Sequence, residues 1–154
     1  MIYLGADHRG YNLKEKIRQW LTEWNQEFED LGNDHLDPED DYPDFAKKVA
    51  EKLSWSGPPA TQASLLALRA RGIVICGSGV GVDIVANRRV GVRCGLGFSA
   101  EQVKKAREDD DINCLAIPAD YLPEEKVKEI VRIFLETKFS GAERMKRRIE
   151  KIDK

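Results

Sequence analysis

The sequence has little cysteine, and its few cysteines are far apart. The chain of 154 residues contains Cys76, Cys94 and Cys114. An odd number of widely spaced cysteines argues against a disulfide framework and against a zinc site. No other set of residues has the spacing of metal ligands. We therefore expect free thiols, a reducing cytoplasmic location and no metal.

Long hydrophobic runs and an excess of positive charge are also missing. No run of about 18 apolar residues occurs, so the sequence predicts no membrane-spanning helix. The first ten residues, MIYLGADHRG, have neither the basic nor the apolar region of a signal peptide. The formal net charge is −2, whereas a general nucleic-acid binder is normally basic. We expect neither a membrane nor a nucleic acid as partner.

Short apolar runs alternate with helical periodicity along the whole chain. This pattern predicts a single domain over residues 1–154 with a three-layer α/β/α fold. The domain would contain a five-stranded parallel sheet in the order 2-1-3-4-5 and end in a basic helix over residues 141–152. A turn-rich stretch over residues 54–64 interrupts the pattern. The strands are expected near residues 2–4, 27–31, 73–76, 92–96 and 114–117.

Two unusual loops follow the first and third expected strands. Parallel sheets bind ligands beyond the carboxyl ends of their strands, where the strand order reverses. The loop after the third strand reads Cys76-Gly77-Ser78-Gly79-Val80-Gly81. Its glycines allow backbone N–H groups to converge on an anion, although the same loop is equally compatible with a plain tight turn. It has no Walker lysine, and its third glycine comes too early for a dinucleotide loop.

Several side chains near these loops have a functional and a structural interpretation. Cys76 lies at the start of a helix, where a thiol can act as a base or nucleophile, but it could equally be a small buried residue. Asp7 and His8 could contact a polyol or phosphate, or could be a capping residue and a surface histidine. Arg144 and Arg148 share one helix face, which suits a phosphate dianion and equally a solvated basic helix.

These elements, in this order, resemble the sugar-phosphate isomerase family of type B ribose-5-phosphate isomerases and galactose-6-phosphate isomerase subunits. The resemblance covers nearly the whole chain outside residues 54–70. It implies aldose–ketose isomerisation of a phosphorylated sugar through a cis-enediolate, without metal or other cofactor. It also implies a Rossmann-like α/β/α fold and a homodimer or dimer of dimers with shared active sites. The matching stretches are LGADHRGYNLKEKI, DYPDFAKKVAEKL, GIVICGSGVGVDIVANRRVGVRCGL and FSGAERMKRRIEKI.

The resemblance also implies a role for each matching residue. Cys76 would move the proton between C1 and C2, and Ser78 would pass a proton between oxygens. Asp7 and His8 would hold sugar hydroxyls or the ring oxygen, and Tyr42 would line the pocket. Arg144 and Arg148 would bind the phosphate. The amides that would hold the enediolate oxygens belong to Gly77, Gly79, Val80 and Gly81.

The chain departs from the family pattern at two places. Asp109 and Asp110 stand where the family commonly has His-Asn, and that histidine is credited with opening the furanose ring. An aspartate can serve as a base there but is a poor acid at neutral pH. The C-terminal Gly-Gly-Arg-His reads Gly-Ala-Glu-Arg-Met over residues 141–145, with one residue inserted. We therefore expect slow use of ribose 5-phosphate, or another substrate such as a tetrose 4-phosphate that cannot close a furanose ring.

Two other functions remain compatible with the sequence. The chain could be a phosphosugar-binding or partner subunit without activity of its own, because related chains combine to form one site in the galactose-6-phosphate branch. The fold would also permit a flavodoxin-like nucleotide or flavin binder. Turnover of an aldose phosphate by the purified protein would exclude the subunit without activity. A bound chromophore would indicate the nucleotide or flavin binder.

Overall fold

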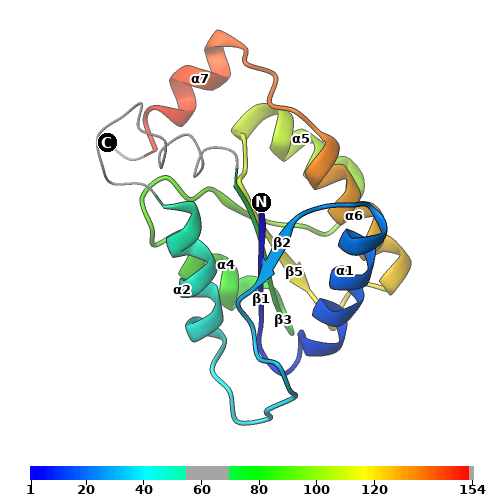
Figure 1. The fold of residues 1–154 in the computed structure, drawn as a ribbon. Helices are drawn as coiled ribbons and strands as arrows, with labels where there is room; N and C mark the ends of the chain where they lie inside the picture. Colours follow the sequence, from blue (N-terminus) through cyan, green and yellow to red (C-terminus); the bar gives the residue numbers. More distant parts are fainter. Residues whose placement is uncertain (55–69, 153–154) are drawn as a thin grey trace.

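The computed structural model describes residues 1–54 and 70–152 (Figure 1). The predicted interruption over residues 54–64 lies outside this part from residue 55 onward. The strands are β1 (Ile2–Ala6), β2 (Phe28–Asp30), β3 (Arg71–Cys76), β4 (Cys94–Leu96) and β5 (Cys114–Pro118). The helices are α1 (Tyr11–Glu23), α2 (Tyr42–Leu53), α4 (Val80–Ala86), α5 (Ala100–Asp110), α6 (Glu124–Glu136) and α7 (Glu143–Ile149).

The five strands form one parallel sheet in the order β2-β1-β3-β5-β4. The parallel sheet is confirmed, but the predicted order 2-1-3-4-5 is corrected, because β5 rather than β4 adjoins β3. The burial of the two strands explains why β5 lies where β4 was predicted. All five residues of β5 are buried, as expected of a central parallel strand covered on both faces. The three residues of β4 are only partly buried, which suits an edge.

Helices cover both faces of the sheet, as predicted for three layers (Figure 1). Successive strand residues point to opposite faces, so β3 contributes to two cores. Ile73 and Ile75 pack with the apolar faces of α1 and α6 and with Val103 of α5. Val74 and Cys76 pack on the other face with α2 and α4. In the part of the chain that the structure describes, no helix is long and apolar enough to cross a membrane.

Helix α5 and the segment that leads into α7 are hydrogen-bonded to each other. The start of α5 is capped by Ser99, whose Oγ accepts a hydrogen bond of 3.1 Å from the N–H of Gln102. Ser140 donates its N–H to the carbonyl of Glu108 at 3.0 Å, which fixes the approach to α7. Helix α7 lies within the predicted range 141–152 and packs against α5 (Figure 1).

Candidate active site

The carboxyl ends of β1, β3 and β5 lie side by side and carry the loops of the candidate site. Cys76 is the last residue of β3, and its register partner Pro118 is the last residue of β5. The N–H of Ala119 donates to the carbonyl of Cys76, and the N–H of Asp120 donates to that of Gly77, both at 3.0 Å. The loop after β5 is therefore fastened to the glycine loop.

These loops enclose a pocket of about 240 Å³ around Cys76. The residues that line it are Asp7, Arg9, Tyr42, Cys76, Gly77, Ser78, Gly81, Asp120 and Tyr121. Six of them, namely Asp7, Tyr42, Cys76, Gly77, Ser78 and Gly81, are site residues that the sequence analysis proposes. The fold thus brings the loop after β1, the glycine loop and the start of α2 together at one pocket.

Sequence reasoning missed Arg9, Asp120 and Tyr121. Arg9 directly follows Asp7-His8 in the same loop, and this position in the sequence could have identified it as a pocket residue. Asp120 and Tyr121 follow β5, and they reach the pocket only because β5 adjoins β3. The uninterrupted apolar run of β5, compared with the arginine and glycine near β4, was the signal for that order.

The glycine loop adopts a turn that other residues would strain. Gly79 has φ +73° and caps α4. A Cβ there would lie 2.5 Å from Leu96 Cδ1 and 3.0 Å from the nitrogen of Pro118. Gly81 lies against the ring of Tyr42, where a Cβ would be 2.8 Å from the aromatic carbons. The N–H of Val80 donates to Ser78 Oγ at 3.3 Å. The glycine loop is therefore a tight turn, and it also forms a wall of the pocket.

Asp7 and His8 lie in different environments. Asp7 is buried, and its Oδ1 accepts a hydrogen bond of 2.9 Å from the N–H of Gly10. Burial raises the pKa of the Asp7 carboxyl. His8 is half-buried beside the pocket, and its Nδ1 lies 2.8 Å from Asp40 Oδ1. That hydrogen bond raises the pKa of His8, so the acidic stretch before α2 favours its protonated form.

Cys94 and Cys114 lie opposite each other in β4 and β5, away from the pocket. Burial raises the pKa of the Cys94 thiol, which keeps it protonated. Both residues pack with the core on the α2 and α4 side of the sheet. Among the three cysteines, Cys76 is therefore the one that lines the pocket.

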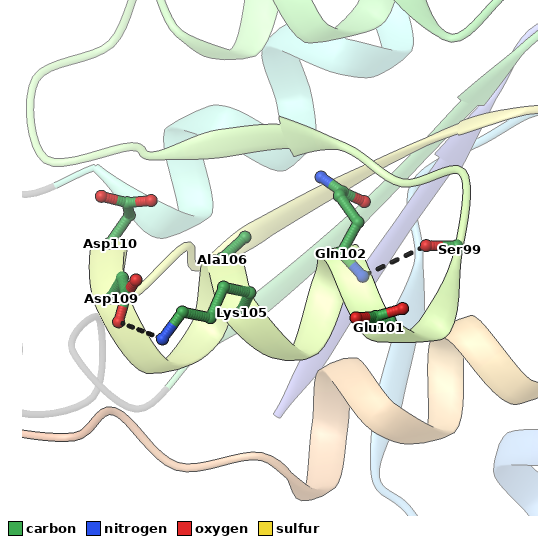
Figure 2. A pocket seen from close by; sticks show the side chains of 7 residues that line it. All are labelled: Ser99, Glu101, Gln102, Lys105, Ala106, Asp109 and Asp110. Atoms are coloured by element: carbon green, nitrogen blue, oxygen red, sulfur yellow. Dashed lines mark hydrogen bonds and ion pairs between the residues drawn. The ribbon is translucent and has the colours of Figure 1, made fainter.

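Asp109 and Asp110 belong to a second, larger pocket of about 470 Å³ along α5 (Figure 2). Its lining consists of Ser99, Glu101, Gln102, Lys105, Ala106, Asp109 and Asp110. Asp109 Oδ1 lies 3.1 Å from Lys105 Nζ, one turn earlier on the same helix. This pocket contains neither a thiol nor the glycine loop, so its size does not make it the reaction site.

One chain does not bring all the proposed site residues together. Helix α5 ends just before the start of β5, whereas Cys76 pairs with the end of β5. Parallel strands rise about 3.3 Å per residue, so β5 separates the two regions by roughly 13 Å. Arg144 and Arg148 are exposed on α7, which packs against α5. Asp109, Asp110 and both arginines therefore lie at the opposite end of the sheet from Cys76.

Comparison with known proteins identifies the family. The model of the ribose/galactose isomerase family matches residues 2–152. The chain belongs to this family. The predicted resemblance to this family is thereby confirmed, and the matched range includes the residues of the Cys76 pocket and of helices α5 and α7. A probable ribose-5-phosphate isomerase B of Mycoplasma pneumoniae is 37% identical over 147 residues, which are 95% of this chain and 89% of that protein.

Other family members extend the comparison to solved structures. Ribose-5-phosphate isomerase B of Mycobacterium tuberculosis is 36% identical over 149 residues, covering 97% of this chain and 85% of that protein. The structure of ribose-5-phosphate isomerase B from Mycoplasma genitalium with bound ribulose-5-phosphate matches with a TM-score of 0.85 and 35% identity, covering 98% and 92% of the two chains. The Clostridium thermocellum enzyme matches with a TM-score of 0.86 and 35% identity, covering 99% and 94%.

Proposed function

We propose that this protein is an aldose–ketose isomerase of a phosphorylated sugar of the ribose 5-phosphate type. The observation that carries the proposal is the pocket in which Cys76, the glycine loop and buried Asp7 meet. A thiol and converging backbone amides suit the enolisation of a sugar, because this reaction needs a base and donors for developing negative charge. The names of the relatives support the same chemistry.

The proposed reaction moves one proton between adjacent carbons. Cys76 removes the proton from C2 of the open-chain aldose as a thiolate, the electron pair forms the C1–C2 double bond of a cis-enediolate, and the π electrons of the C1 carbonyl move onto its oxygen. Amides of residues 77–81 stabilise the enediolate oxygens, and the Ser78 hydroxyl passes a proton from one oxygen to the other. Cys76 then returns its proton to C1, which gives the ketose without net oxidation. Asp7 and His8 would hold the sugar hydroxyls, and Tyr42 would line the pocket.

We also propose that two subunits complete each site in a homodimer or dimer of dimers. The phosphate arginines Arg144 and Arg148 lie at the opposite end of the sheet from Cys76, as do Asp109 and Asp110. One sugar phosphate cannot contact both ends of the same chain. A second copy that places its α5 and α7 over the pocket of the first would supply the missing groups. We further propose a cytoplasmic location, with which the three free thiols agree, and a single domain over residues 1–154, with which the single sheet agrees.

Mixing inactive subunits tests this arrangement. In coexpressed Cys76→Ala and Arg148→Gln chains, each heterodimer would contain one intact site. Random pairing should then restore about a quarter of the wild-type activity at low substrate concentration. A matched pair, Cys76→Ala with Ser78→Ala, changes the same half of the site twice and should restore nothing. Equal activity of the two mixtures would show that each chain works alone.

The presence of Asp109 determines which sugar phosphate we expect to be the better substrate. Asp109 Oδ1 accepts a hydrogen bond from Lys105 Nζ, so this oxygen acts as an acceptor where a ring-opening acid must donate. We expect erythrose 4-phosphate, which has no furanose form, to be isomerised faster than ribose 5-phosphate. Asp109→His should raise kcat/KM for ribose 5-phosphate about tenfold or more and leave erythrose 4-phosphate unchanged.

The same assay on purified protein decides between the proposal and its rivals. Efficient use of ribose 5-phosphate that is unaffected by Asp109→Asn would contradict the role of Asp109. Binding of phosphosugars without turnover of ribose, allose, galactose or erythrose phosphates would instead indicate a binding or partner subunit.

A further inference from the structure

Arg9 is a residue of the Cys76 pocket that the proposed mechanism does not use. Among the described residues that line this pocket, it is the only one with a cationic side chain. Its side chain is 59% exposed, so packing in the core does not explain its position. The neighbouring charged groups on the lining, Asp7 and Asp120, are both acidic.

Asp120 holds Arg9 across the glycine loop. The Arg9 Nη2 donates to Asp120 Oδ2, which joins the loop after β1 to the loop after β5. The backbone N–H of Asp120 is itself bound to the carbonyl of Gly77. A Cβ on Gly77 would lie 2.6 Å from Arg9 Nε and 2.5 Å from Asp120 Oδ2. The ion pair therefore lies directly over the residue that follows Cys76, and the absence of a side chain at Gly77 makes room for it.

The charge of the substrate and the shape of the guanidinium fit each other. A sugar phosphate brings a dianion into a pocket whose other charged lining residues, Asp7 and Asp120, carry carboxyl groups, so a cation among them offsets the repulsion. A guanidinium has five N–H donors in a planar fork that matches phosphate oxygens. The hydrogen bond found among the described residues uses one nitrogen, Nη2, and leaves Nε and Nη1 for other acceptors.

We propose that Arg9, positioned by Asp120, binds the phosphate group of the substrate from the same subunit that supplies Cys76. The inference rests on the proposed function for the identity of the sugar phosphate, but the binding of phosphate itself does not require turnover. Arg9 would then complement Arg144 and Arg148 from the second subunit. If the ion pair only fastened two loops, its loss would change stability and leave phosphate affinity unaltered.

Titration of the full-length protein with inorganic phosphate, followed by calorimetry, tests the proposal. We expect Arg9→Gln to weaken phosphate binding, and to raise KM for the preferred sugar phosphate, by about tenfold to a hundredfold. The change in kcat should be much smaller, because the thiol and amides remain. Arg9→Lys should restore part of the affinity, since it keeps the charge but loses the fork. Arg132→Gln, at an exposed arginine paired with Glu136 on α6, is the matched control and should change neither constant.

The outcomes separate this inference from the proposed function. Unchanged phosphate affinity and KM in Arg9→Gln would overturn the role of Arg9, even if the wild-type protein isomerises sugars. A lower melting temperature with unchanged phosphate affinity would overturn it as well, because the ion pair of Arg9 and Asp120 would then only connect two loops. Phosphate binding that is lost in Arg9→Gln, in a protein that turns over no aldose phosphate, would support Arg9 and refute the isomerase.

Discussion

Replacing Cys76 with alanine is expected to lower kcat for the preferred aldose phosphate by about 10²–10⁴-fold, the usual contribution of a general base. Cys76 is the cysteine that lines the pocket, and it directly precedes the glycine loop. No neighbouring side chain in the proposed mechanism can take its place, because Ser78 is needed between the oxygens. The binding of the substrate should change little, since the amides and arginines are retained.

Solvent exchange provides a second measurement of the same step. In heavy water the abstracted proton on the Cys76 thiol should exchange with solvent before C1 is reprotonated, so the wild-type protein should incorporate deuterium at C1 of the ketose and Cys76→Ala should not. The matched control is Cys94→Ala, which changes a thiol in β4 away from the pocket. Full turnover and exchange in Cys76→Ala, or their equal loss in Cys94→Ala, would exclude the thiol as the base.

Gly79→Ala is expected to destabilise the protein by about 2–5 kcal/mol, from a strained left-handed residue and from overpacking. Gly79 has φ +73°, and the added methyl would collide with Leu96 and with the backbone around Pro118. These neighbours belong to β4 and β5, so they cannot move without disturbing the sheet. Urea unfolding measures the loss, and the displaced loop should also reduce kcat/KM.

A second glycine separates the two contributions to that loss. Gly141 also has a positive φ, +68°, but a Cβ there would meet nothing within 4 Å. Gly141→Ala should therefore show the backbone strain alone, about 1–2 kcal/mol. Equal losses at the two positions would mean that the close packing around the glycine loop contributes nothing to stability.

Local pattern was sufficient to predict the type of fold and the proximity of the loops after β1 and β3. Hydrophobic period specifies whether a segment is a strand or a helix, because each has one geometry for burying its apolar side chains. The glycine loop and Asp7 could be placed at one edge of the sheet, since parallel strands end on the same side. Within that half, chemistry and position are properties of contiguous residues, such as residues 76–81.

Tertiary structure alone decided which strand lies beside β3 and which residues remain apart. The exchange of β4 and β5 depends on how much of each strand the whole molecule buries, a quantity that no short segment contains. It brings Asp120 and Tyr121 to Cys76 and sets the partner of Arg9. The return of α5 and α7 to the amino ends of the strands separates Asp109, Arg144 and Arg148 from the thiol. Sequence identifies these side chains, whereas their distance from Cys76 follows from the path of the chain across the sheet.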